Sequence, residues 1–446
     1  SLRESIKGSS STFACGGSVA IENVAYGGTP QLRGRSHPVN VFWESDSTVQ
    51  KLVLPINQKN KSAVKHLQSL AGDCIPATFG RGDQDVLDPT YRRAGKLEPA
   101  HFSSNFHPAD FGIIDQIEQD LLPTINDGPG SSGYRRKIIP ELYKLNVYTG
   151  PSGFFHKHVD TPRGPKQIGS LVVCLPSEFK GGVLHVRNGG QDLSYDWSHA
   201  SGSAIQWAAF YSDCEHEIKA VTEGERITLT YNLYATEIGT EGIPSALSLA
   251  PQSQHLYSAL VKSLKEPSFM TEGGIVGLFC SHAYPHMSGT TAKSMKGLLK
   301  TSDYGLYSAI RSCGVDVDAL PVSDTGSWYA SIMKRLQRET NDTSKGKEEY
   351  TKMASDVWPS VQLNGITWLN EPNRDEIAFA HIPQLRGGPA PVAYGNDAVK
   401  PPVAFGNDAV KPMAFDKEKL SVVQYTDAAI FAVIQPWEKR SESLAL

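Results

Sequence analysis

The sequence has no hydrophobic run long enough to cross a membrane and no marked excess of one charge. A membrane-spanning helix needs about 20 consecutive apolar residues, and no such run occurs. The 446 residues include 43 basic and 47 acidic side chains, a net charge of −4. This balance lacks the basic footprint that nucleic-acid binding requires. We therefore expect neither a membrane nor a nucleic acid as a partner.

Cysteine is also scarce, at 6 residues scattered along the chain without CxxC spacing. Such a distribution favours reduced thiols over a disulfide framework. The polar stretch Ser1–Ser11 has no apolar segment of the kind found in signal peptides. We therefore expect a cytoplasmic, intracellular location.

The length of the chain favours two or three domains. We predict an N-terminal α/β segment over residues 1–126, a core over 127–240 and a C-terminal α+β region over 241–446. Residues 391–412 contain one eleven-residue unit twice, as Pro391–Pro401 and Pro402–Pro412. Two copies are too few for a solenoid, so the repeat predicts an exposed duplicated loop whose removal leaves the core intact.

The most specific pattern is a set of possible metal ligands. His158 and Asp160 lie two positions apart in a segment rich in strand formers, so both side chains project to one side. His216 begins a second segment of this kind, after 55 intervening residues. Two histidines and one carboxylate on one side of Fe(II) leave positions open for a bidentate co-substrate and O2.

A basic residue follows these ligands. We predict a tight turn at residues 222–225, which would fold the chain back and bring Arg226 close to His216. In the strand after it, Arg226, Thr228 and Thr230 share one face and apolar residues share the other. A guanidinium can hold a carboxylate through two parallel hydrogen bonds, which predicts a dicarboxylate co-substrate.

Four motifs carry a family likeness: Tyr148–Gly153, the His158–Asp160 pair, Gly181–Gly182 and Val221–Arg226. Together they resemble the prolyl 4-hydroxylase-type branch of the Fe(II)/2-oxoglutarate-dependent oxygenases, over residues 141–234. The resemblance implies that His158, Asp160 and His216 bind iron and form the catalytic centre. It also implies that 2-oxoglutarate is bound by Arg226, assisted by Thr228 and Tyr148. Prolyl hydroxylases often carry Lys where this chain has Arg226, so the resemblance does not specify the substrate.

The fold implied is mainly β with α, with a double-stranded β-helix (jelly roll) core, flanking helices and the C-terminal α+β region. The activity implied is a dioxygenase that couples oxidative decarboxylation of 2-oxoglutarate to hydroxylation, desaturation or cyclisation of a small organic substrate. Its cofactors would be Fe(II), 2-oxoglutarate and O2. Two alternatives stay open: a peptidyl-prolyl or other protein hydroxylase, and a non-catalytic module that senses oxygen or 2-oxoglutarate.

Several neighbouring residues have competing interpretations. His156 shares the predicted face of His158 but has no carboxylate two positions later, so we place it in the pocket wall or beside a ligand. Cys214 either faces the cavity or is buried as a small apolar residue, and Tyr148 either donates a hydrogen bond or packs in the core. His282 and His286 lack an accompanying carboxylate and are interrupted by Pro285, so we assign them a structural role.

Two segments are expected to support the core. In residues 109–122 the apolar side chains recur at helical spacing, which predicts an amphipathic helix against the outer face of the jelly roll. They are Phe111, Ile114, Ile117 and Leu121. The Gly80–Asp83 loop, which contains Arg-Gly-Asp, is predicted to be a turn near the mouth of the site.

Overall fold

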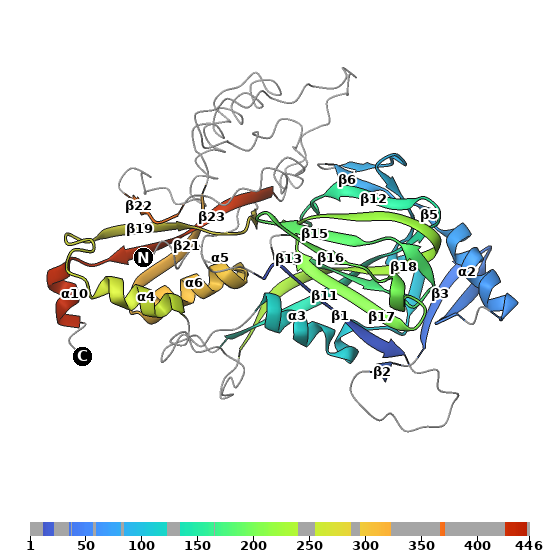
Figure 1. Cartoon of the computed structure of the whole chain (residues 1–446), viewed down its shortest axis with the longest axis horizontal. Helices are drawn as coiled ribbons and strands as arrows, with labels where there is room; N and C mark the ends of the chain where they lie inside the picture. Colours follow the sequence, from blue (N-terminus) through green and yellow to red (C-terminus); the bar gives the residue numbers. More distant parts are fainter. Residues whose placement is uncertain are drawn as a thin grey trace, which may run out of the picture.

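A computed structural model describes residues 12–21, 35–36, 38–56, 59–81, 84–122, 134–164, 166–239, 255–286, 295–322, 366–370 and 424–443. Within them a β-rich body lies beside a smaller α+β region (Figure 1). The duplicated loop at residues 391–412 lies outside the described residues.

The larger sheet of the body is built mainly from antiparallel strands. Alternating β-branched and aromatic residues give these strands one face for the cavity and one for the outer core. Its strands run in the order β2 (Arg35–Ser36), β1 (Ala14–Ile21), β17 (Ala204–Tyr211), β13 (Gln167–Cys174), β18 (Glu215–Gly239), β11 (Tyr134–Thr149), β9 (Gly95–Leu97) and β5 (Ile75–Pro76).

A smaller sheet joins the larger one through β18. Its strands are β8 (Arg92–Arg93), β12 (Gly153–His158), β14 (Phe179–Gly181), β15 (Leu184–Asn188) and β16 (Gln191–Tyr195). Side chains from both sheets line one cavity, for example Thr228 from the larger sheet and Phe155 from the smaller. Two antiparallel sheets that share a cavity confirm the predicted jelly roll.

β18 is one continuous strand of 25 residues, which corrects the prediction of a tight turn at 222–225. Its first part pairs with β12, β14 and β15, and its second part pairs with β11 and β13. The chain changes sheets at Gly224, whose φ is 73°. A Cβ there would lie 2.2 Å from the Glu178 carbonyl oxygen, so only glycine fits the bend. The sequence motif marked the bend correctly, but the two halves extend into different sheets and do not pair with each other.

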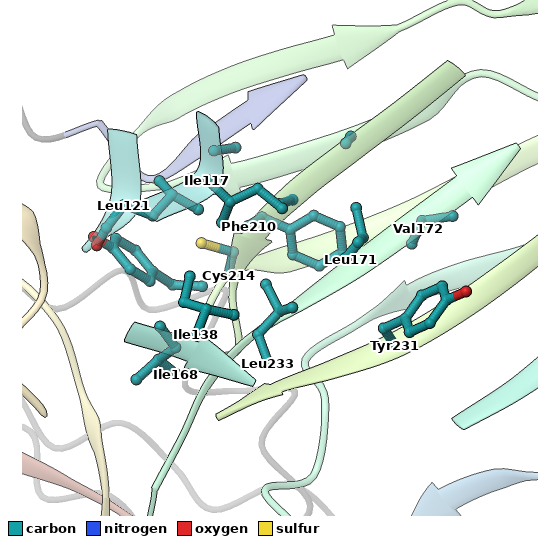
Figure 2. Close-up of a cluster of buried hydrophobic side chains, with 14 of the residues drawn as sticks. Ile117, Leu121, Ile138, Ile168, Leu171, Val172, Phe210, Cys214, Tyr231 and Leu233 are labelled. Carbon is teal, nitrogen blue, oxygen red and sulfur yellow. Dashed lines mark hydrogen bonds between the residues drawn. The ribbon is translucent and has the colours of Figure 1, made fainter. Parts of the chain in front are cut away.

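The outer face of the larger sheet is covered by α3 (Ile113–Leu121), which packs on β1, β11 and β17. Ile114, Ile117 and Leu121 are buried there, as the helical spacing predicted. Figure 2 shows Ile117 and Leu121 beside Phe210 and Cys214, with Leu171 and Leu233 in the same cluster. Phe111 falls outside the helix, in a short 3-10 turn (η2, Pro108–Phe111) that ends at the left-handed Gly112.

The remaining N-terminal elements lie at the far end of the body in Figure 1. A three-stranded sheet has the order β10 (Phe102–Ser104), β3 (Val39–Ser45) and β4 (Thr48–Leu54), and α2 (Lys61–Asp73) packs on β4. Two further short strands, β6 (Phe79–Arg81) and β7 (Gln84–Val86), form a hairpin. The sequence itself predicts strands at 38–44 and 51–56, from their strand-forming residues, and an amphipathic helix at 63–71, and these correspond to β3, β4 and α2.

The C-terminal region is α+β, as predicted. Its sheet has the order β20 (Tyr284–His286), β23 (Gln424–Ile434), β19 (Gly274–Phe279) and β22 (Ile366–Trp368), and β21 (Asp316–Val322) pairs with β23. The helices α4 (His255–Leu264), α5 (Met295–Leu298) and α6 (Thr301–Ser312) lie along one side of this sheet, and α10 (Trp437–Ser443) ends the described chain (Figure 1). A helical pattern at 302–313 followed by Gly314 is evident in the sequence and corresponds to α6, which ends just before Gly314, whose φ is 74°.

Two expectations from composition can be compared with the structure. All 6 cysteines lie within the described residues, and each is a free thiol. Among the described helices, none combines the length and the apolar character needed to span a bilayer.

Candidate metal centre

Two histidines face each other across paired strands. His158 ends β12 and is the register partner of His216 near the start of β18, and their ring centroids lie 4.1 Å apart. His158 Nδ1 lies 2.8 Å from the carbonyl oxygen of His156, and His216 Nδ1 lies 3.1 Å from that of Cys214. When the Nδ1–H of an imidazole donates to a backbone carbonyl, the lone pair of Nε2 is left free to bind a metal ion. Both imidazoles are thereby oriented as metal ligands.

Asp160 completes the cluster from just beyond the end of β12. One ligand atom from each of His158, Asp160 and His216 can be chosen so that all lie within 4.8 Å of one another. Asp160 Oδ1 lies 3.7 Å from His216 Nε2, and Asp160 Oδ2 accepts a hydrogen bond of 2.5 Å from the Ser170 hydroxyl. Ser170 therefore fixes one oxygen and leaves the other directed to the histidines.

The chemistry of this donor set fits Fe(II). Two imidazole nitrogens and one carboxylate oxygen are the ligands of mononuclear non-haem iron, and they leave coordination positions open. Within the described residues this is the one group of three or more His, Cys, Asp or Glu side chains close enough to hold a metal ion. The sequence pattern and the structure therefore agree on where such an ion would bind.

The cluster opens onto a cavity of about 560 Å³ between the two sheets. Thr228, Thr230 and Asn232 of β18 line it from the larger sheet, while Phe155 and Ile218 line it from the smaller. The apolar residues that alternate with the first three, Ile227, Leu229 and Tyr231, are buried in the core. This alternation confirms the predicted polar lining and apolar backing of the strand.

Arg226 shares one face of β18 with the cavity-lining Thr228 and Thr230, but its side chain is fully buried and does not itself line the cavity. Its guanidinium carbon lies 5.5 Å from the centroid of the Tyr148 ring and 5.0 Å from that of Trp197. All three of its side-chain nitrogens are buried without a hydrogen-bond partner among the described residues. Burying a charged donor in this way costs free energy unless an acceptor is supplied. A carboxylate is the acceptor that matches its geometry.

Tyr148 and Thr228 stand beside Arg226. Tyr148 is the register partner of Arg226 on β11, and both Tyr148 and Thr228 line the cavity. Tyr148 is 2% exposed and belongs to the hydrophobic core as well. Tyr148 therefore packs in the core, as one of the two alternatives predicted, and its hydrogen bond to 2-oxoglutarate stays a prediction.

The His156 ring does not line the cavity, so the pocket-wall alternative is wrong, whereas the backbone carbonyl of His156 does lie beside the ligand His158. His156 is exposed, and its ring lies 4.7 Å from that of Phe154. The reason is that the pairing of β12 with β18 shifts register between Phe155 and His158. Such an irregularity breaks the strict alternation of side chains from which the position of His156 was predicted.

Cys214 is buried away from the cavity. Its thiol lies in the core cluster, with Sγ 3.9 Å from the Phe13 carbonyl oxygen. Burial raises the pKa of this thiol well above its usual range, and the nearby Asp213 acts in the same direction. It is therefore the small buried apolar residue of the two alternatives.

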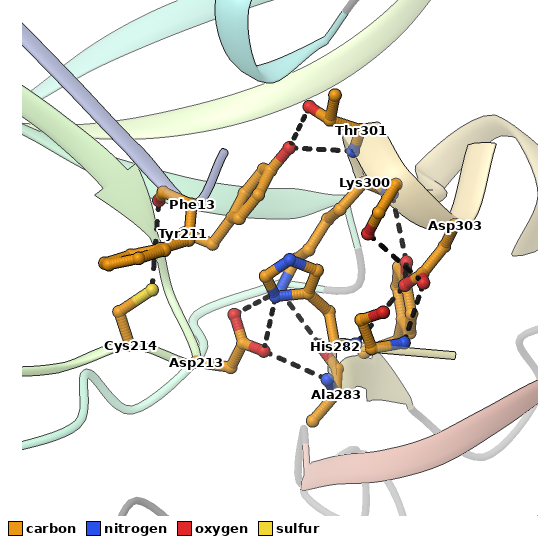
Figure 3. Close-up of polar contacts among 12 residues, drawn as sticks. Phe13, Tyr211, Asp213, Cys214, His282, Ala283, Lys300, Thr301 and Asp303 are labelled. Carbon is orange, nitrogen blue, oxygen red and sulfur yellow. Dashed lines mark hydrogen bonds and ion pairs between the residues drawn. The ribbon is translucent and has the colours of Figure 1, made fainter. Parts of the chain in front are cut away.

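The turn that precedes His216 is fixed by the C-terminal region (Figure 3). Lys300 Nζ donates to Asp213 Oδ1 at 2.5 Å, while the Ala283 N–H and His282 Nδ1 contact Asp213 Oδ2 at 3.0 and 3.1 Å. Burial alone would raise the pKa of Asp213, but the charges of Lys300 and His282 outweigh it and hold that pKa well below its usual range. His282 is structural, as predicted, although a carboxylate does accompany it.

The sequence interpretation missed several charged residues of the cavity. Lys144, Arg92 and Arg163 line it, together with Asn146. Strand alternation was a signal for part of this set, because Lys144, Asn146 and Tyr148 are spaced by two along β11. Phe79 and Gly80 of β6 also line the cavity, which puts the segment before Gly82 at the site as expected.

Comparison with known proteins supports this centre. Residues 143–234 match the 2OG-Fe(II) oxygenase superfamily, and this segment contains all three residues of the cluster together with Arg226. No curated protein matches the chain.

Three solved structures show partial likeness. A prolyl-4-hydroxylase from Pseudomonas putida is 18% identical, with 39% of this chain and 83% of that chain covered and a TM-score of 0.25. A 2OG-Fe(II) oxygenase family oxidoreductase from Burkholderia pseudomallei is 14% identical, with coverages of 39% and 80% and a TM-score of 0.20. A prolyl hydroxylase from Trichoplax adhaerens, solved with a hypoxia inducible factor peptide, is 14% identical, with coverages of 38% and 76% and a TM-score of 0.26.

Proposed function

Because residues 143–234 form a 2OG-Fe(II) oxygenase domain, we propose that the protein is a dioxygenase that oxidises a small organic molecule at His158, Asp160 and His216. One oxygen atom of O2 enters the substrate and the other enters the succinate formed from 2-oxoglutarate, with release of CO2. Bound iron supplies the redox chemistry of this reaction. The residues of the chain bind and orient the reactants and exclude water.

This proposal is carried by one arrangement: the His158–Asp160–His216 cluster occurs together with the buried guanidinium of Arg226. Among the described residues that guanidinium has no hydrogen-bond acceptor. Arg226 would hold the distal carboxylate of 2-oxoglutarate by two parallel hydrogen bonds, with Thr228 and Tyr148 beside it. A complete set of metal ligands beside a cavity is expected of an enzyme more than of a non-catalytic sensing module. We therefore favour catalysis.

The dimensions of the cavity favour a small substrate over a peptide. Its volume of about 560 Å³ lies in the usual range for small-molecule sites, roughly 300 to 1,000 Å³. Aromatic and polar side chains from both sheets line it, including Phe155 of the smaller sheet and Asn146 of the larger. Hydroxylation is the default outcome, because Asp160 retains the carboxylate that the ligand set needs.

The test uses single substitutions and a control on the same strand. His158→Ala, Asp160→Ala and His216→Ala should each weaken Mn(II) binding by more than the 10- to 100-fold that loss of an outer hydrogen-bond partner costs. His156→Ala should leave it unchanged, since that exposed ring is outside the cavity. Mn(II) affinity is measured by titration, and succinate formation from 2-oxoglutarate is measured with Fe(II).

Full succinate formation in any of the three ligand variants would refute the assignment. The same assay identifies the substrate class when it is run with a panel of organic acids, amines and proline-containing peptides. Stimulation by the peptides alone would replace the small-molecule proposal with a peptidyl hydroxylase.

A further inference from the structure

A group of cationic side chains in the cavity has no role in the reaction described above. Lys144 of β11, Arg92 of β8 and Arg163 all line the cavity, and we call these three residues the cationic subsite. Lys144 is 5% exposed. No hydrogen bond or ion pair joins its amine to another residue in the described part of the chain. Its Nζ lies over an aromatic ring, 4.0 Å from the centroid of the Tyr143 ring.

The two arginines add further positive charge beside Lys144. Arg92 donates to the Thr78 carbonyl and to Asn146 Oδ1, each at 2.7 Å, and its Nε is buried without a partner. Arg163 donates to the Tyr143 hydroxyl, and its guanidinium carbon lies 4.4 Å from the centroid of that ring. The Tyr143 ring thus has a cation 4.0 Å and another 4.4 Å from its centre.

The neighbouring acids do not neutralise the subsite. Burial raises the pKa of Tyr143 to about 12, so its phenol stays uncharged. Glu98 pairs with Lys96 at 2.7 Å, and Asp88 Oδ1 accepts from the backbone and hydroxyl of Thr90 at 2.8 and 2.6 Å. The lowered pKa of Lys144, about 7, reflects burial first and the charges of Arg92 and Lys96 next.

The subsite is separate from the place assigned to 2-oxoglutarate. Along β11, Tyr148 is the register partner of Arg226, whereas Lys144 is the partner of Thr230. Four residues of strand correspond to roughly 13 Å. In the proposed function the metal and Arg226 would take the two carboxylates of 2-oxoglutarate. The amine of Lys144 is therefore left for another molecule.

We propose that the cationic subsite binds an anionic group, a carboxylate or a phosphate, of the primary substrate, a deduction that rests on the proposed function. Bringing an anion to this place offsets the cost of the buried cations and adds charge-assisted hydrogen bonds. The aromatic wall nearby, where Arg92 lies 4.3 Å from the centroid of the Phe155 ring, suits an apolar or aromatic body. The substrate class is a small organic acid or phosphate ester.

The test compares matched probes on the protein loaded with Mn(II) and saturated with 2-oxoglutarate. Benzoate and phenyl phosphate carry the anion, and benzamide is the neutral counterpart of benzoate. Calorimetric titration should show at least one anion binding about tenfold or more tightly than benzamide. Lys144→Met and Arg163→Met should each remove most of that preference. Lys180→Met is the control, since Lys180 is an exposed residue outside the cavity paired with Glu223.

The outcomes separate this proposal from the one on which it rests. Wild-type protein that fails to bind 2-oxoglutarate would refute the proposed function itself. If it binds 2-oxoglutarate but prefers neither anion to benzamide, only the subsite proposal fails. The subsite proposal alone also fails if 2-oxoglutarate competes with the anionic probe, because the cationic subsite would then bind the co-substrate. Arg163 is exposed, so its variant keeps the test valid if Lys144→Met does not fold.

Discussion

At the scale of single residues, the site consists of side chains held in place by specific partners. Ser170 fixes one oxygen of Asp160, and backbone carbonyls fix both metal-facing histidines. Arg226 is the exception, because its guanidinium is buried without a hydrogen-bond acceptor in the part of the chain that the structure describes. Residues in such a state are stable in a fold only when a ligand or the surrounding packing compensates for them.

We predict that Arg226→Ala raises the Kd for 2-oxoglutarate roughly 10- to 100-fold, because it removes a charge-assisted bidentate contact of about 1.5 to 3 kcal/mol. Arg226→Lys should give an intermediate value, since an amine keeps the charge but loses the planar fork. Titration of the two Mn(II)-loaded variants with 2-oxoglutarate measures both Kd values. An unchanged Kd in Arg226→Ala would assign the distal carboxylate to another cation.

Lys144 predicts a distinctive pH dependence. Its pKa is lowered from 10.5 to about 7 in the folded protein, so between these values the unfolded chain binds a proton that the folded protein has lost. The free energy of unfolding of the wild type should therefore rise with pH in that window relative to Lys144→Met, by up to about 1.4 kcal/mol per pH unit. Urea unfolding of both proteins at several pH values from neutral upward measures this difference in the free energy of unfolding. A constant difference between the two proteins would show that Lys144 is charged in the folded state.

Strand alternation predicted part of the site and failed at identifiable places. It correctly gave the cavity-facing side of β18 and the separate apolar side of that strand. It failed where pairing is irregular. Tyr143 is the unpaired residue where β11 shifts register against β18, so Tyr143 and Lys144 both line the cavity although they are adjacent. No local feature of the sequence specifies such a bulge, because it depends on the partner strand.

At the scale of elements, β18 is the part that organises the centre. It carries His216 in the smaller sheet and Arg226 in the larger, and its bend at Gly224 sets their relation. The sequence indicated the bend through its glycine, but it could not tell a hairpin from a strand that passes between sheets. That distinction depends on which strands are available as partners, which is a property of the tertiary fold.

We predict that Gly224→Ala costs about 1 to 3 kcal/mol more free energy of unfolding than Gly190→Ala. Both glycines have positive φ, at 73° and 77°, so the backbone strain is matched. A Cβ at Gly224 would meet the Glu178 carbonyl oxygen at 2.2 Å, whereas at Gly190 it would meet nothing within 4 Å. Denaturant unfolding of the two variants gives the comparison. Equal losses of unfolding free energy in the two variants would mean that the backbone at Glu178 moves away from the added Cβ at no cost in free energy.

At the scale of the whole molecule, the oxygenase core and the C-terminal region share one continuous hydrophobic cluster. Their polar junction lies at Asp213, three residues before His216, where Lys300, His282 and the Ala283 N–H converge. The secondary structure of the C-terminal region was partly predictable from helical spacing and from Gly314. Its contact with Asp213 in the turn before His216 was not, because no sequence pattern links a carboxylate to a lysine in another region.

Lys300→Met should lower the free energy of unfolding by about 3 to 5 kcal/mol, because it leaves Asp213 buried without its cation. Mn(II) affinity should also fall, since Asp213 belongs to the turn that positions His216. The double variant Asp213→Asn/Lys300→Met should recover part of the lost stability, and Lys265→Met, at an exposed lysine of the same region, is the control. A loss below about 1 kcal/mol in Lys300→Met would contradict this role for the junction.

The junction also has a consequence for the order in which the protein matures. Asp213 leaves the ribosome 87 residues before Lys300, so a nascent chain that has completed β18 still lacks the cation that anchors its last turn. The strands of the β-rich core can pair before this point, but the turn before His216 acquires its final support only when Lys300 has been synthesised. We therefore expect a chain truncated before Lys300 to have a less ordered metal centre than the full chain.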